Sequence, residues 1–241
     1  MRISVVVPAF NEEKLLPASL RSIKSAAEAF HARGWDTELI VCDNNSTDAT
    51  GEVARAEGAL VVFEPVNQIA RARNAGAAAA TGAWLVFVDA DSRPSRELFA
   101  DTADAITSGR FVGGGVTVKL DEFFFGMSFF TWLWNTTSRI RKWCAGSFIF
   151  CRADAFRAIG GFSSELFASE EIDLSKRLKA HGKRNGQKLT ILHRHPLVTS
   201  ARKMHLYRHR DYLRLLWRMV LTQGKAVKQR EACHIWYDGR R

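Results

Sequence analysis

Short apolar runs alternate with helix-forming segments in the N-terminal part of the chain, and this alternation restricts the fold more than any other feature. The apolar runs, rich in Val and Ile, cover residues 3–7, 38–42, 59–63 and 84–88. The helix-forming segments between them cover residues 11–34, 47–57 and 69–80. Strands that alternate with helices at this spacing form a parallel sheet with helices on its faces. The sequence therefore predicts an α/β fold with a doubly wound, mostly parallel sheet.

The remainder of the chain predicts a less regular pattern. Helices are expected at residues 97–107, 152–159 and 170–181, and strands at 111–120, 146–151 and 189–198. Three consecutive glycines, Gly113 to Gly115, predict a bend within the strand 111–120. Residues 207–228 carry apolar and basic side chains at helical spacing, which predicts a basic C-terminal helix.

Polar residues gather where three of the predicted strands end, at residues 8–12, 43–46 and 89–91. In open sheets of this kind ligands bind beyond the carboxyl ends of the strands. The three clusters therefore predict a single ligand site at this edge of the sheet.

Asp89 and Asp91 directly follow the strand 84–88 and are separated by one residue. Two carboxylates in a turn suit Mn²⁺ or Mg²⁺, which take oxygen ligands beside substrate phosphates. The alternative is a strand-end turn whose acids face water, because a single D-x-D pair is common. Asp43 has two interpretations as well: its carboxylate either accepts a hydrogen bond from a nucleobase or forms an Asx turn before the next helix.

Five motifs, in order, carry a family resemblance. They are SVVVPAFNE at 4–12, DNNSTD at 43–48, ARNAG at 72–76, DAD at 89–91, and GGF at 160–162 followed by EEIDL at 170–174. Together they resemble the motifs of the family 2 glycosyltransferases, which have the GT-A fold. The resemblance covers about residues 3–182, and five motifs in order make chance agreement improbable. Two positions depart from the family pattern: Glu171 stands where the family has Asp, and Asn45 where many members have Gly.

The resemblance implies an inverting, metal-dependent glycosyltransferase that moves a sugar from a UDP- or GDP-sugar to an acceptor hydroxyl or a lipid phosphate. It assigns the nucleotide-sugar contacts to Pro8, Ala9, Glu12, Asp43, Arg73 and Asp89. Asp91, together with Asp89, would bind the cation. On this basis residues 1–110 form the nucleotide-sugar-binding half, 111–200 the half with the acceptor and the catalytic base, and 201–241 a basic tail. The processive synthases of the family carry a Q-x-x-R-W motif that is absent here, so transfer of a single sugar is expected.

The general base corresponds to Glu171, and Asp173 is the second candidate. A carboxylate there would take the proton of the acceptor hydroxyl. The alternative is that Glu170 and Glu171 stabilise the N-terminus of the helix 170–181 through its dipole.

Two later segments offer further candidates. His193 and His195 lie on one face of a predicted strand. Some GT-A enzymes recruit a late histidine, so His195 is a candidate metal ligand, although a pair of partly buried strand histidines is the more common reading. Arg202 follows that strand and is a candidate clamp on the diphosphate; the alternative is a solvated charge run.

The formal charge of +10 favours anionic partners. Residues 123–134 are rich in aromatic side chains and basic residues follow, which suits a lipid-linked acceptor or a membrane surface; a core or homodimer contact is the alternative.

The apolar run 3–7 is too short for a signal peptide, no run is long enough to span a membrane, and the cysteines form no C-x-x-C pair. A cytoplasmic protein is therefore expected, and peripheral association with the inner face of the membrane stays open beside it. Two other classes stay open: a catalytically silent nucleotide-sugar-binding scaffold, and a nucleic-acid binder, which is not expected because no recognition module is present.

Overall fold

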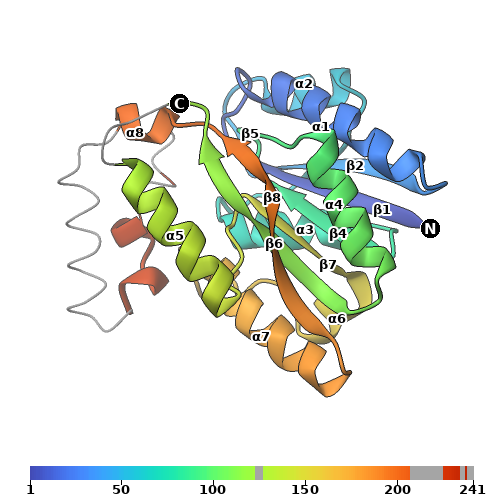
Figure 1. Ribbon diagram of the computed structural model, residues 1–241. Coiled ribbons are helices and arrows are strands. Elements are labelled where there is room, and N and C mark those ends of the chain that lie inside the picture. Colours follow the sequence, from blue (N-terminus) through green and yellow to red (C-terminus); the bar gives the residue numbers. More distant parts are fainter. Residues whose placement is uncertain (123–126, 207–224, 234–236, 238–241) are drawn as a thin grey trace.

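The computed structural model describes residues 1–122, 127–206, 225–233 and 237, and it has a central sheet with helices on both faces (Figure 1). The strands are β1 (Arg2–Ala9), β2 (Asp36–Asp43), β3 (Leu60–Phe63), β4 (Trp84–Val88), β5 (Ser92–Arg93), β6 (Phe111–Leu120), β7 (Phe148–Arg152) and β8 (Lys188–Thr199). The helices are α1 (Leu16–His31), α2 (Thr50–Ala56), α3 (Ile69–Ala79), α4 (Arg96–Thr107), α5 (Met127–Arg141), α6 (Ala153–Ala158), α7 (Glu170–Arg184) and α8 (Arg202–Leu206). Two 3₁₀ turns follow, η1 (Lys225–Lys228) and η2 (Arg230–Cys233).

The described strands form one sheet in the order β3-β2-β1-β4-β7-β6-β8-β5. β1 pairs in parallel with β2 and β4, and β2 pairs in parallel with β3. In the other half, β7 is antiparallel to β4 and β6, whereas β6 and β8 are parallel. The predicted α/β fold with a mostly parallel, doubly wound sheet is thus confirmed.

The side chains of β1 show why its sequence is continuously apolar. Val5 and Val7 enter one apolar cluster with residues of α1 and α4, while Val6 enters a second cluster with residues of α3, α6 and α7. Successive side chains of a strand point to opposite faces, so a strand covered on both faces needs apolar residues at every position. The same holds for β4, whose five residues are all buried, and its predicted bounds are confirmed.

The first helix begins later than predicted, at Leu16 instead of residue 11. Asn11 has a φ of 53°, in the left-handed region, so it turns the chain and does not start the helix. The adjacent Glu12 is buried and does not act as an exposed first-turn acid. The stretch between β1 and α1 is therefore a loop at the edge where ligands are expected.

Further elements differ from the sequence-based expectation. No element is predicted for α5, for the two-residue strand β5 or for the short helix α8. Gly113 to Gly115 lie within β6, and the register of β6 against β8 shifts between Phe111 and Gly113; the glycine bend itself stays a prediction. These glycines allow close approach: a Cβ on Gly113 would lie 2.5 Å from the Phe150 carbonyl oxygen.

Most of the predicted basic helix, residues 207–224, lies outside the described residues. Residues 225–228 of that prediction form the 3₁₀ turn η1 instead of an α-helix. The four cysteines are free and buried, as expected for reduced thiols. Among the helices of the described segments, none combines the length and apolar character that crossing a membrane requires.

Candidate functional site

The carboxyl ends of β1, β2 and β4 surround a cavity of about 60 Å³. Its lining consists of Pro8, Ala9, Phe10, Glu12, Asn44, Asn67, Ile69, Asp89, Ala90, Asp91 and Tyr237. The three polar clusters that follow the predicted strands therefore do converge. Pro8, Ala9, Glu12 and Asp89, which the sequence assigns to the nucleotide sugar, share this cavity with the predicted metal ligand Asp91.

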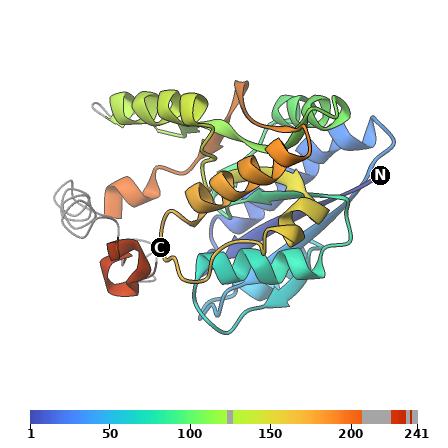
Figure 2. The same ribbon diagram turned by 90° about the horizontal axis from the view of Figure 1, so that it is seen from below.

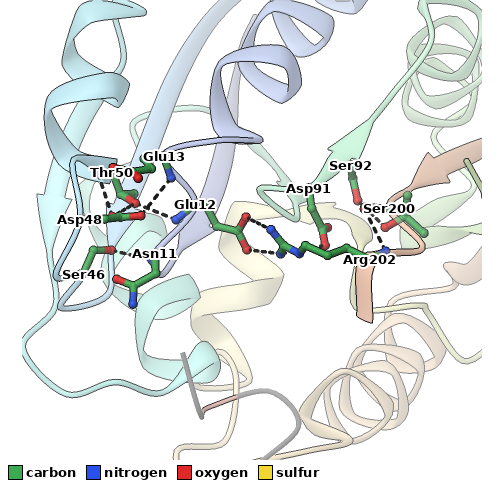
Figure 3. A network of polar contacts seen from close by, with 11 residues as sticks. Asn11, Glu12, Glu13, Ser46, Asp48, Thr50, Asp91, Ser92, Ser200 and Arg202 are labelled. Carbon is green, nitrogen blue, oxygen red and sulfur yellow. Dashed lines mark hydrogen bonds and ion pairs between the residues drawn. The ribbon is translucent and has the colours of Figure 1, made fainter. Parts of the chain in front are cut away.

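The loop after β1 is held by the loop after β2 (Figure 3). The backbone nitrogens of Asn11 and Glu12 donate to the hydroxyls of Ser46 and Thr50, at 3.0 and 2.8 Å. The backbone nitrogen of Glu13 donates to Asp48 at 3.2 Å. Asp48 thus links the two loops and fixes the rim of the cavity.

Glu12 also forms an ion pair with Arg202, which follows β8 (Figure 3). Two nitrogens of the guanidinium donate to its two carboxylate oxygens, at 2.9 and 2.8 Å. One of these nitrogens lies 3.8 Å from Asp91 Oδ2. The Nε of Arg202 is buried and has no hydrogen-bond partner within the described part of the chain. A buried donor without a partner is uncommon, and here it lies next to the predicted diphosphate site.

A second cavity, of about 230 Å³, adjoins the first, because Ile69 and Asp89 line both. The rest of its wall is Arg73, Gly146, Ser147, Phe167, Ala168, Ser169, Glu170 and Glu171. The start of α7 and the end of β4 therefore face a common space, with Asp89 at the junction.

Arg73 organises this second cavity from α3. Its guanidinium donates to Glu170 Oε1 at 2.7 Å, to Asp89 Oδ1 at 2.9 Å and to the Gly146 carbonyl at 2.9 Å. Burial alone would lower the pKa of Arg73, but the carboxylates of Asp89 and Glu170 raise it above its usual value. The side chain therefore stays cationic although it is only 3% exposed.

Glu171 has no ion-pair partner among the described residues, unlike Glu170 beside it. Burial and then the charge of Glu170 raise the pKa of Glu171 to about 8, and the nearby Arg73 opposes this only in part. A carboxylate with a raised pKa beside a polar cavity is what a general base needs near neutral pH.

Three other predicted residues are placed differently. Asp173 lines neither cavity; it forms an i,i+4 ion pair with Arg177, whose Nε lies 2.8 Å from Asp173 Oδ2. His195 also lines neither cavity, and its Nδ1 lies 3.0 Å from Asp101 Oδ2 of α4. Its role as a metal ligand stays a prediction.

Asp43 also lies outside the lining of both cavities. One of its carboxylate oxygens accepts from the backbone nitrogen of Ser46 at 3.0 Å, which is the Asx-type turn that the sequence left open. The next residue, Asn44, lines the first cavity in its place. Contact between Asp43 and a nucleobase stays a prediction.

Sequence reasoning missed Asn44, Asn67, Glu170 and Tyr237. Asn44 belongs to the DNNSTD motif, so its position was available; its amide bridges the carbonyls of Glu64 and Val66 and the backbone nitrogen of Gln68. Asn67 and Tyr237 carry no local signal, since tertiary structure alone brings them to the cavity.

The donor set fits a hard divalent cation. Asp89 and Asp91 line one cavity, and their carboxylates are hard oxygen ligands. Within the described residues, no three His, Cys, Asp or Glu side chains are arranged to hold an ion by themselves. Mg²⁺ commonly binds through one or two carboxylates together with substrate phosphates, and this arrangement suits that mode.

The sequence model of the family described as "Glycosyl transferase family 2" matches residues 4–159 of this chain. An uncharacterized glycosyltransferase of Mycobacterium tuberculosis is 42% identical over 89 residues, which are 37% of this chain and 36% of that protein. Glycosyltransferase AglE of Haloferax volcanii is 26% identical over 192 residues, which are 73% of this chain and 60% of that protein. The chain thus spans less than two thirds of the length of these relatives.

Two solved structures share the fold. The Staphylococcus aureus TarS structure in complex with UDP-GlcNAc has a TM-score of 0.64 at 19% identity, over 99% of this chain and 71% of that one. Glucosyl-3-phosphoglycerate synthase from M. tuberculosis, in complex with Mn²⁺, UDP and phosphoglyceric acid, has a TM-score of 0.61 at 22% identity, over 96% of this chain and 78% of that one.

Proposed function

Because the chain belongs to glycosyl transferase family 2, we propose that it transfers a single sugar from a UDP-sugar to an acceptor hydroxyl, with inversion at the anomeric carbon. The family resemblance predicted from the motifs is confirmed, and so is the GT-A fold. The donor, the cation, the stereochemistry and the acceptor are parts of the proposal.

One observation carries the proposal: Asp89 belongs to the walls of both cavities. The first cavity holds the strand-end loops and Asp91, and the second holds Glu171. If the sugar binds at Asp89, its diphosphate would lie toward Asp91 and Arg202. The carboxylate of Glu171 would then lie on the other side of the sugar, where a base is needed.

The residues have separate tasks in this mechanism. Ionised Glu171 takes the proton from the acceptor hydroxyl, whose oxygen forms a bond to the anomeric carbon as the bond to the diphosphate breaks on the opposite face. Arg73 holds Asp89 and Glu170 in place, and Arg202 supplies positive charge beside the diphosphate. Asp89 and Asp91 would hold Mn²⁺ or Mg²⁺, which, when bound, neutralises charge on the leaving diphosphate.

UDP is proposed over GDP because the two fold neighbours described above were solved with UDP or UDP-GlcNAc. The acceptor is proposed only by class: a hydroxyl, or a lipid phosphate if the acceptor is lipid-linked. Neither cavity identifies it.

The test is release of UDP from a panel of UDP-sugars by the purified chain with Mn²⁺, with water as the acceptor. We expect slow hydrolysis of at least one donor, abolished by Asp91→Ala and by chelation of the metal. A catalytically silent scaffold would instead show a thermal shift with UDP and Mn²⁺ but no release. Salt-sensitive binding to nucleic acid, without response to any nucleotide sugar, would favour the nucleic-acid reading.

A further inference from the structure

Helix α5 presents its apolar side to solvent. Its exposed apolar residues are Phe129, Phe130, Trp132, Leu133 and Ile140, with exposed fractions of 59, 58, 60, 45 and 72%. Phe129 packs against both Phe130 and Trp132, with ring centroids 5.9 Å apart in each pair. Scattered exposed apolar residues need no explanation, but a contiguous aromatic group of this kind usually marks an interaction surface.

The orientation of α5 is fixed by polar contacts on its opposite side. The Asn135 side chain accepts from the Val118 backbone nitrogen at 3.0 Å and donates to the Val118 carbonyl at 2.9 Å. Ser138 is buried and donates to the Trp143 carbonyl at 2.6 Å. Asn135 and Ser138 thus attach the helix to β6 and to the chain that follows it, and the aromatic side is left outside. α5 forms one edge of the molecule in Figure 2.

Basic residues border this surface. At about 100° per residue, Phe129, Leu133 and Ile140 share one face within ~40°, and Arg139 and Arg141 lie on its two flanks. The helix contains no acidic residue. The acids before it, Asp121 and Glu122, are already paired with Arg93 and His205.

We propose that the exposed face of α5 is a docking surface for an anionic lipid bilayer, with Phe129, Trp132 and Leu133 inserted among the lipids and Arg139 and Arg141 at the headgroups. Aromatic residues favour the membrane interface, and Arg side chains can extend from an apolar face to reach phosphates. With 15 residues the helix is about 22 Å long, so it would lie along the surface.

Charge favours a bilayer over a second copy of this chain. The chain carries a formal charge of +10, and the borders of the α5 face are cationic. A second copy would bring an equally basic border and a further +10, whereas an anionic bilayer complements both. The proposal is independent of glycosyl transfer.

The experiment is co-sedimentation of the full chain with phosphatidylcholine vesicles and with phosphatidylcholine–phosphatidylglycerol vesicles. We expect binding to the mixed vesicles, weakened by salt, and about tenfold weaker partitioning for the Phe129→Ser/Trp132→Ser variant. The matched control is Leu60→Ser/Phe63→Ser on β3, whose side chains are 55 and 59% exposed and should not contribute.

A second variant, Arg139→Gln/Arg141→Gln, keeps the proposal falsifiable if the first does not fold. It should lose binding to mixed vesicles at low salt. Equal binding of the wild type to both vesicle types, no binding to either, or equal losses in the β3 control would overturn the proposal. Light scattering would also overturn the proposal if it showed that the wild type forms dimers and that Phe129→Ser/Trp132→Ser dissociates them without changing vesicle binding.

Discussion

The guanidinium of Arg202 and the carboxylate of Glu12 form a two-point ion pair, with nitrogen–oxygen distances of 2.9 and 2.8 Å, although the residues are 190 positions apart. Glu12 follows β1 and Arg202 follows β8, so the pair connects two strands that are far apart in the sheet order. It also holds the guanidinium of Arg202 3.8 Å from Asp91 Oδ2. The pair therefore contributes both to folding and to the electrostatics of the proposed diphosphate site.

Removing one partner of this pair should destabilise the protein more than removing both. Arg202→Met removes the guanidinium of the two-point ion pair with Glu12, whose side chain is only 8% exposed, and breaking a buried pair costs about 3 kcal/mol. Glu12→Gln/Arg202→Met removes both charges of the pair and should recover part of that loss. Urea unfolding of the single and double variants measures the difference, and additive losses would contradict the interpretation.

Asn67→Ala should weaken UDP binding with little loss of stability. Asn67 Oδ1 is buried and lacks a hydrogen-bond partner within the described residues, while its amide nitrogen makes one long bond, 3.3 Å, to the Asn44 carbonyl. If a nucleotide donor satisfies that oxygen, its removal should cost about tenfold in affinity.

Calorimetric titration with UDP and Mn²⁺ measures this effect, and thermal unfolding without ligand provides the control. An unchanged affinity would mean that Asn67 faces only water in the complex.

The sequence predicted the part of the site that depends on local pattern. Asp89 and Asp91 follow a strand whose five apolar residues fix its end, so their position at the sheet edge follows from the order of the residues alone. His195 shows the limit: its strand and the helix 97–107 were both predicted, but the contact between them, in which His195 Nδ1 lies 3.0 Å from Asp101 Oδ2, was not. Glu170 shows another limit: only the fold reveals that Arg73, 97 residues away, pairs with it and not with Glu171.

The raised pKa of Glu171 makes stability depend on pH with a definite sign. From its ordinary 4.5 to about 8, the folded state keeps a proton that the unfolded chain has released. The cost of ionising Glu171 therefore appears as pH rises through this window, and stability falls. Glu171→Gln cannot ionise, so its melting temperature relative to the wild type should increase with pH.

Differential scanning calorimetry at about pH 5 and about pH 8.5 tests this, at roughly 2–4 °C per kcal/mol for a chain of this size. Glu165→Gln is the control. Glu165 is exposed, and the hydrogen bond from Lys228 lowers its pKa, so it stays ionised across the window and its variant should show no such trend.

The same carboxylate should set the pH dependence of transfer. A general base must be ionised, so kcat/KM should rise with pH up to an apparent pKa near 8 for the free protein. Beside burial, the negative charge of Glu170 raises the pKa of Glu171. Glu170→Gln removes that charge and should move the rise of kcat/KM to lower pH. Glu171→Gln should lower the rate by about a hundredfold or more at every pH. Asp173→Asn, which only breaks the ion pair with Arg177, should leave the rise of kcat/KM with pH unchanged. UDP release, measured across the pH range with the acceptor present, distinguishes Glu171 from Asp173 as the base. If Asp173→Asn abolished the rise of kcat/KM with pH while Glu171→Gln stayed active, the base would be Asp173.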